Sequence, residues 1–185
     1  MSILAKSILT RSILTGSMLT KSAAGLVVIL IAAYGIGQFT SKSISTEIDI
    51  AAPADAVWDE LADVDGHADW NPLLKHMSGD LSVGSRLAVT IQSGGNAPMT
   101  FTPVVLVSDE ARELRWLGHL GFRGIFDGEH YFILEQVSAD TTRLRHGETF
   151  SGMLAPVLFA LIGEDTEAGF KAMNAALKAR VESAG

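Results

Sequence analysis

The sequence of 185 residues contains no cysteine, which excludes disulfide bonds, thiolate nucleophiles and cysteine-based zinc or iron–sulfur sites. Its five scattered histidines include no HExxH motif, and neither segment 67–69 nor Glu164-Asp165 has the partner spacing of a zinc or calcium site. No Gly-x-Ser-x-Gly motif indicates a serine hydrolase, and no predicted helix follows the glycine-rich segment 93–96, as a phosphate-binding loop requires. We therefore expect neither a metal ion nor another cofactor.

Basic residues are scarce beyond the N-terminus. The chain has 14 Lys and Arg against 21 Asp and Glu, for a net charge of −7. Residues 1–42 contain four of the basic residues and no acidic residue, so 10 basic residues stand against 21 acidic ones in the remainder, a net charge of about −11. Such an acidic domain without a Lys/Arg cluster repels phosphate backbones. Nucleic acid is therefore not expected as a partner.

An uncharged stretch of 17 residues runs from Ala23 to Phe39. This length is at the lower limit for crossing a bilayer. We predict a retained transmembrane helix over about 23–39, which divides the chain into an N-terminal segment, 1–42, and one domain, 43–185. Two alternatives are a cleaved secretory signal, which gives a secreted or periplasmic domain, and a buried helix of the domain itself.

The charges beside this stretch predict its orientation. Lys6, Arg11 and Lys21 precede it, whereas only Lys42 follows it closely. Positive charge is retained on the cytoplasmic side of a membrane. A single-pass protein with a cytoplasmic N-terminus and a noncytoplasmic domain is the expected topology.

Beyond residue 42 the hydrophobic pattern is that of an α+β domain. Apolar and polar residues alternate over 44–50, as in a half-buried strand. Pro53 is predicted to occupy the first helical position, N1, of a helix that ends near Gly66. Six more strands and a long C-terminal helix are predicted at 74–81, 86–92, 100–107, 113–120, 126–137, 142–150 and 154–182. This order favours an antiparallel sheet covered on one face.

Several short motifs occur in this same order: Ala52–Trp58, Trp70-Asn71-Pro72, Gly79–Gly84, Phe126–His130 and His146–Gly152. With the closing helix they resemble the SRPBCC (START/polyketide cyclase/birch-pollen-allergen) superfamily over about residues 43–183. The resemblance implies a helix-grip fold, in which a curved, seven-stranded antiparallel sheet surrounds a long C-terminal helix and leaves a hydrophobic tunnel. It does not fix a function, because members include lipid carriers, hormone receptors, cyclases and chaperone activators.

The turn at 138–140 sets the register of the last two predicted strands. Three residue pairs then face each other: His130 and Glu148, Phe132 and His146, and Leu134 and Leu144. The alternate positions pair Glu135 with Arg143, and this charge pair belongs in water. The set that contains the two leucines is therefore predicted to face inward.

Folding the preceding hairpin about 121–124 places Trp116 opposite His130 and Leu114 opposite Phe132. We predict that these inward residues bind the ligand, together with three from the C-terminal helix region and Trp70 at the cavity mouth. Ordinary core packing is the alternative for the three helix-region residues and the favoured interpretation for Trp70. The predicted ligand-binding residues are Trp70, Leu114, Trp116, Phe126, His130, Phe132, His146, Glu148, Phe150, Met153, Phe159 and Phe170. Apolar walls around a few convergent polar groups are typical of small-molecule sites.

His130, His146 and Glu148 are the candidate catalytic residues. Burial raises the pKa of a carboxyl group, and a neighbouring imidazolium lowers it. A close His130/Glu148 pair therefore has the residue types that acid–base chemistry requires. Three interpretations stay open from the sequence: the groups only satisfy one another's hydrogen bonds, they anchor a ligand, or they transfer protons.

Three functions follow from these expectations. The leading hypothesis is a membrane-anchored, noncatalytic binder or carrier of a small hydrophobic ligand, lipid or polyketide-like, held between the sheet and the C-terminal helix. The second is a cyclase or dehydratase that uses the inward His/Glu cluster. In the third, the protein is an accessory subunit of a membrane protein complex, and the N-terminal segment serves for assembly.

Overall fold

Eight strands and three helices lie between residues 42 and 184 in the computed structural model, which describes residues 25–29, 31–32, 34–35, 41–92 and 97–184. The strands are β1 (Lys42–Ile50), β2 (Leu74–Gly79), β3 (Leu87–Ile91), β4 (Met99–Phe101), β5 (Val104–Asp109), β6 (Glu113–His119), β7 (Asp127–Ser138) and β8 (Thr141–Ser151). The helices are α2 (Ala54–Ala62), α3 (His67–Trp70) and α4 (Ala155–Ala184). The predicted order of elements is confirmed, with α3 as an unpredicted addition.

The strands form two antiparallel sheets rather than the single seven-stranded sheet predicted. The larger sheet has the order β1-β8-β7-β6-β5 and the smaller has the order β2-β3-β4. The strand predicted over 100–107 is two strands, because Pro103 lacks the amide hydrogen that a continuous ladder needs. β4 pairs with β3, whereas β5 pairs with β6, and an isolated bridge between Arg86 and Val104 joins the sheets.

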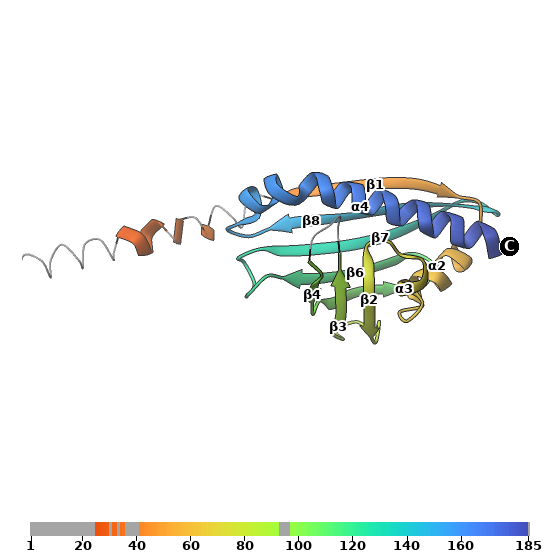
Figure 1. Cartoon of the computed structure of the whole chain (residues 1–185), viewed down its shortest axis with the longest axis horizontal. Coiled ribbons are helices and arrows are strands. Elements are labelled where there is room, and N and C mark those ends of the chain that lie inside the picture. The colour runs from red at the N-terminus through yellow and green to blue at the C-terminus, as the bar shows by residue number, and fades with distance from the viewer. Residues whose placement is uncertain (1–24, 30, 33, 36–40, 93–96, 185) are drawn as a thin grey trace, which may run out of the picture.

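The long helix α4 lies along the larger sheet (Figure 1). The smaller sheet lies on the same side of the larger sheet as α4. Gly152, with a φ of +104°, makes the turn between β8 and α4, a conformation that favours glycine. α4 then continues without a break through Gly163 to Ala184. Its apolar stripe, Phe170, Met173, Leu177 and Val181, is buried.

The predicted register of β6, β7 and β8 is confirmed at every pair. His130 faces Glu148 and Trp116, and Leu134 faces Leu144. Leu144 is fully buried, so the inward face is the one that was predicted.

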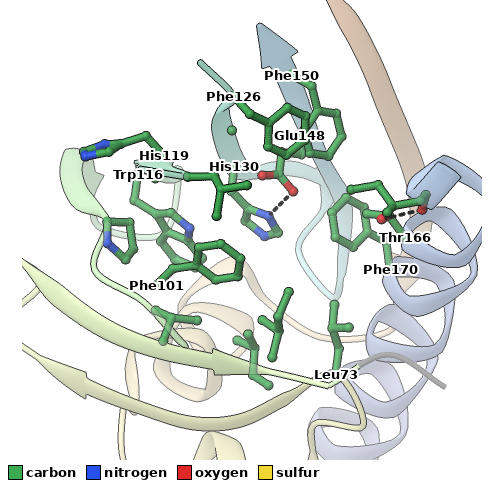
Figure 2. A pocket seen from close by; sticks show the side chains of 18 of the residues that line it. Leu73, Phe101, Trp116, His119, Phe126, His130, Glu148, Phe150, Thr166 and Phe170 are labelled. Atoms are coloured by element: carbon green, nitrogen blue, oxygen red, sulfur yellow. Dashed lines mark hydrogen bonds and ion pairs between the residues drawn. The ribbon is translucent and has the colours of Figure 1, made fainter. Parts of the chain in front are cut away.

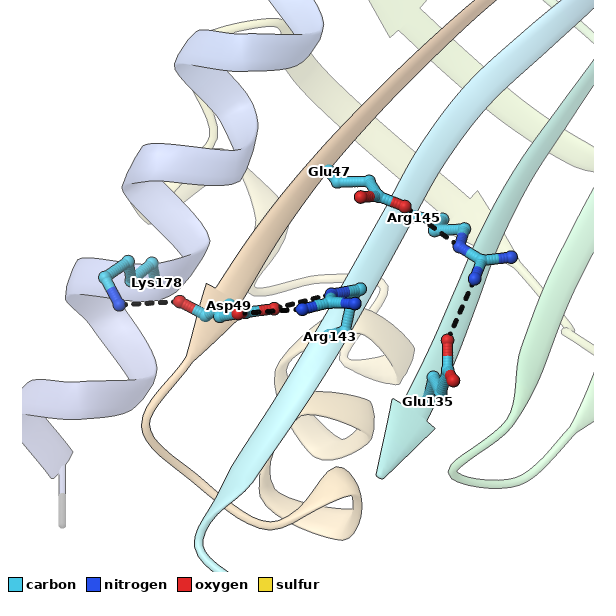
Figure 3. A network of polar contacts seen from close by, with 6 residues as sticks. All are labelled: Glu47, Asp49, Glu135, Arg143, Arg145 and Lys178. Carbon is cyan, nitrogen blue, oxygen red and sulfur yellow. Dashed lines mark hydrogen bonds and ion pairs between the residues drawn. The ribbon is translucent and has the colours of Figure 1, made fainter. Parts of the chain in front are cut away.

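The outer face of the sheet carries a network of ion pairs (Figure 3). Glu135 and Arg143 are opposite each other in the sheet, as predicted, but each forms its ion pair with a different residue. Arg143 binds Asp49 at 2.8 Å, and Arg145 binds both Glu135 and Glu47 at 3.0 Å. Asp49 and Glu47 lie directly opposite these arginines on β1, whereas Glu135 is a diagonal neighbour of Arg145 on β7. The prediction considered only β7 and so missed the carboxylates that β1 supplies on the other side of β8.

The segment that joins α3 to β2 explains the Trp70-Asn71-Pro72 motif. The Asn71 side-chain oxygen accepts hydrogen bonds from the backbone N–H groups of Leu73 and Leu74, both at 2.9 Å. Its amide nitrogen donates to His67, whose Nε2 donates to the Leu61 carbonyl at 2.9 Å. These buried bonds tie both helices to the start of β2.

At the start of α2, Pro53 occupies the N-cap rather than the predicted N1 position.

No helix in the described part of the chain is both long and apolar enough to span a membrane. The predicted transmembrane segment, 23–39, is described only at 25–29, 31–32 and 34–35, which are helical, and its other residues lie outside the described part.

Candidate functional site

A cavity of about 150 Å³ lies between the inner face of the larger sheet, the smaller sheet and α4 (Figure 2). Most of its lining is apolar. The lining residues are Leu73, Leu74, Val89, Ile91, Phe101, Pro103, Trp116, Gly118, His119, Leu120, Phe126, Gly128, His130, Glu148, Phe150, Ile162, Thr166, Phe170 and Met173. This composition, with a few polar groups among aromatic and aliphatic walls, is usual for a small-molecule site.

Half of the predicted ligand-binding residues line this cavity. They are Trp116, Phe126, His130, Glu148, Phe150 and Phe170. Four of them come from strands β6, β7 and β8, Phe126 lies just before β7, and Phe170 comes from α4, so three consecutive strands and the helix bring their side chains to one volume.

The other six predicted residues do not line it. Leu114 and Phe132 are packed in the main core, and His146 is fully buried one layer behind His130. Met153 lies in the turn before α4, and Phe159 packs behind Phe150 with ring centroids 5.7 Å apart. Trp70 packs against the main core from α3, the alternative that the sequence favoured over a cap at the cavity mouth. Inward-facing side chains near the middle of the sheet are covered by neighbours, and alternation alone does not separate them from cavity walls.

Sequence reasoning missed the wall that the smaller sheet supplies. Leu74, Val89, Ile91 and Phe101 come from its three strands. Their alternation predicted strands, but nothing in it showed that β2–β4 would face the cavity. Asn174 was also missed, although its place within the apolar stripe of α4 signals a buried polar group in need of a partner.

Glu148 is the acidic residue of the cavity wall. Its Oε2 lies 3.5 Å from His130 Nδ1. Its carboxyl group sits over Gly128 of the neighbouring strand, where any Cβ atom would overlap Glu148 Oε1. Glycine at position 128 therefore makes the room that the carboxyl group occupies. The 20% of the Glu148 side chain that stays accessible lies in the cavity wall.

A chain of hydrogen bonds runs from His130 toward α4. His130 Nε2 lies 3.0 Å from His146 Nε2, and His146 Nδ1 lies 2.7 Å from Asn174 Oδ1. Asn174 Nδ2 donates to Thr46 Oγ1 at 2.9 Å, and that hydroxyl donates to the His146 carbonyl at 2.9 Å. These four residues, His130, His146, Asn174 and Thr46, form a buried polar row that joins strands β1, β7 and β8 to helix α4.

This row assigns the protons on both imidazoles. The Asn174 oxygen is an acceptor, so His146 carries its proton on Nδ1. The Nε2 of a neutral His146 is then an acceptor, and His130 donates to it from its own Nε2. The remaining nitrogen of His130, Nδ1, is unprotonated and faces Glu148. A protonated Glu148 complements this arrangement, because its O–H group faces the unprotonated Nδ1 of His130.

Burial acts on all three titratable groups in the same sense, toward the neutral form. Burial lowers the pKa of His130 to about 3. It lowers the pKa of His146 well below its ordinary value, and the neighbouring His130 adds to the shift. Burial also raises the pKa of Glu148 to about 8. The cavity therefore presents an uncharged proton donor at neutral pH.

Aromatic rings hold the two imidazoles in place. Trp116 stacks on His130 with an interplanar angle of 2° and centroids 4.8 Å apart. Phe170 stacks on His146 at 4.1 Å. These contacts fix the ring planes, so the direction in which His130 Nδ1 points is set before any ligand arrives.

A family profile described as polyketide cyclase/dehydrase and lipid transport matches residues 41–182. The chain belongs to this family. The resemblance inferred from the sequence motifs is confirmed, and so is an α+β helix-grip-like fold with a curved antiparallel sheet and a C-terminal helix. No curated protein sequence matches the chain.

Solved structures share this fold at low identity. The Zhui aromatase/cyclase from Streptomyces sp. R1128 is 20% identical, with a TM-score of 0.64 over 77% of this chain and 94% of that one. A START superfamily protein from Mycobacterium smegmatis is 20% identical, with a TM-score of 0.59 over 77% and 99%. Norcoclaurine synthase from Thalictrum flavum, in complex with dopamine and hydroxybenzaldehyde, is 17% identical, with a TM-score of 0.61 over 80% and 91%. These similarities establish the fold alone.

The raised pKa of Glu148 predicts a pH-dependent stability difference. Between about pH 4.5 and 8 the folded carboxyl group holds a proton that the unfolded one has released, so rising pH destabilises the native state. Glu148→Gln has no such proton. Its free energy of unfolding relative to wild type should rise with pH from 5 to 8, by up to about 1.4 kcal/mol per pH unit.

Urea denaturation at several pH values measures this difference. Glu182→Gln is the matched control, because a hydrogen bond from Lys178 lowers the pKa of Glu182 and places its titration below this window. A Glu148→Gln difference that stays constant between pH 5 and 8 would show that the carboxyl group is ionised in the folded protein.

Proposed function

We propose that this domain binds one small, mostly apolar molecule in the cavity between its sheets and α4, as a noncatalytic binder or carrier. The observation that carries the proposal is the cavity itself, about 150 Å³ of space beside a single neutral carboxyl group. A fully packed core has few voids larger than a water molecule. Space of this size, lined by aromatic side chains, supports the binding of a small molecule.

The walls indicate the ligand's chemistry. Trp116, Phe126, Phe150 and Phe170 offer ring surfaces, and a volume near 150 Å³ suits a ring of about six carbon atoms. A charged ligand would lose its hydration without gaining an opposite charge. A neutral ring that carries a hydroxyl or carbonyl group satisfies both the walls and Glu148. The ring compounds bound to norcoclaurine synthase are consistent with a ligand of this kind in the same fold.

Filling the cavity should abolish binding. Gly118 lines the cavity, and a Cβ atom there would make only ordinary contact with Pro103, at 3.7 Å. Gly118→Leu should therefore fold and weaken the binding of phenol, measured by calorimetry, by at least about tenfold, because the new side chain occupies the ligand's volume. Ser45→Leu adds the same side chain to the outer face of β1 and should bind phenol as wild type does. Equal affinities for the two variants would rule out this cavity.

Acid–base catalysis is the second candidate function. It is favoured by one observation: the Glu148 carboxyl group lines the cavity and has a pKa of about 8, close to the working pH of most enzymes. His130 Nδ1, at 3.5 Å, is positioned to share its proton. A cyclase or dehydratase acting on an aromatic or polyketide-like substrate would use Glu148 in this role.

Glu148→Gln separates the two functions, because it keeps size and hydrogen-bonding capacity and removes the transferable proton. An enzyme should keep its substrate affinity and lose turnover by about 10² to 10⁴ fold. Mass spectrometry of products formed from polyketide-like substrates measures turnover, and calorimetry measures affinity. Turnover that survives the substitution would remove Glu148 from the chemistry.

We also propose that the uncharged stretch at 23–39 anchors the domain on the noncytoplasmic face of a membrane. The support is its length and the excess of positive charge before it. Protease added to spheroplasts that express the full chain should digest the domain. Full protection of the domain, with digestion after lysis, would reverse this orientation.

A further inference from the structure

Exposed apolar side chains gather at one end of the domain. The apolar end consists of Leu120, Phe122, Leu154, Val157, Leu161 and Ile162. Phe122 is 68% exposed and Leu161 is 73% exposed. The loop between β6 and β7 is bonded to the start of α4, because the Leu154 N–H donates to the Ile125 carbonyl at 2.8 Å. In Figure 1 this end holds the β6–β7 connection, the end of β8 and the first turns of α4.

The first turns of α4 and the residues just before this helix contain no charged side chain. Residues 151–163 contain no Asp, Glu, Lys or Arg, whereas charged residues recur along α4 from Glu164 onward. Arg123 in the loop and Lys42 at the start of β1 flank the apolar end on the sheet side, whereas the exposed acidic residues Glu164 and Asp165 follow it along α4. The two basic residues stand out because the domain as a whole is strongly acidic. Such a surface complements an apolar layer with anionic groups at its boundary.

The N-terminal segment reaches the domain at this end. Lys42, the first residue of β1, is paired with Phe150 near the end of β8. The uncharged stretch of the sequence ends at Phe39, only three residues before Lys42. A chain spans at most about 3.6 Å per residue, so Lys42, at this end of the domain, lies within about 11 Å of the point where the stretch ends.

The cavity opens at this end as well. Leu120 and Ile162 both line the cavity and are solvent-exposed, at 44% and 38%. His119, beside Leu120, is also exposed and lines the cavity. The mouth of the cavity is therefore continuous with the apolar end.

We propose that the apolar end docks onto the surface of a lipid bilayer, so that the cavity opens toward the lipid and exchanges its ligand there. The exchange of ligand with the lipid rests on the proposed binding function, whereas the docking itself does not. Contiguous exposed apolar side chains of this kind mark interaction sites on proteins. Phe122, Val157 and Leu161 would enter the interfacial layer, while Arg123 and Lys42 would contact lipid phosphates.

The absence of cysteine allows a direct test with single spin labels. Phe122→Cys and Val137→Cys place a label at the apolar end and at the opposite end of β7, where Val137 is 51% exposed. The full chain is reconstituted into vesicles of phosphatidylcholine and phosphatidylglycerol. Collision of each label with oxygen, which concentrates in lipid, and with a water-soluble nickel chelate is then measured.

The label at position 122 should collide with oxygen several-fold more, relative to the nickel chelate, than the label at position 137. Equal ratios at the two positions, with both labels open to the chelate, would overturn the proposal. A second copy of the chain on this surface would overturn it differently: the label at 122 would show spin–spin broadening without lipid, and unlabelled protein would remove the broadening. Phenol binding to the same variants is measured separately, so failure of docking and failure of ligand binding are distinguishable.

Discussion

The hydrogen bond between His146 and Asn174 is the constraint on which the site depends. It joins the sheet to α4 at 2.7 Å, and it fixes which nitrogen of His146 carries the proton. That choice sets the donor and acceptor order of the whole buried row and leaves His130 with an unprotonated nitrogen toward Glu148. Buried polar groups without partners cost free energy, so the row is stable only when every member is paired. A contact that holds the fold together therefore also determines the protonation of a group in the cavity wall.

The position of this row between two apolar clusters shows how packing and chemistry share the interior. One cluster, with Phe132, Leu144 and Leu177, fills the region under α2 and the C-terminal half of α4. The other, with Phe150, Ala155 and Phe170, lies toward the start of α4. The cavity lies where the two clusters meet, because Leu74, Val89, Trp116 and Met173 of the first cluster line it together with Leu73, Phe126, Phe150 and Phe170 of the second. The residues that pack the core on either side therefore also form the walls of the open space.

The sequence predicted the register of β6, β7 and β8 because tight turns leave few pairings and only one of them buries Leu134 and Leu144. It did not predict the side-chain partners on the outer face, because Asp49 and Glu47 come from β1, and the pairing of the last three strands did not include β1. The sequence analysis predicted β4 and β5 as one strand. The two strands join different sheets on either side of Pro103, and the sequence pattern does not show which sheet each one joins. The wall formed by Val89 and Phe101 depends on how two sheets are placed in space, and periodicity along one strand contains no such information.

Gly128 has a consequence for the acid in the cavity wall. Every other amino acid carries a Cβ atom, and that atom would occupy the place of the Glu148 carboxyl group. Any substitution at Gly128 therefore forces this carboxyl group to move. The position of the one acidic group in the cavity wall depends on the absence of a single carbon atom from the neighbouring strand.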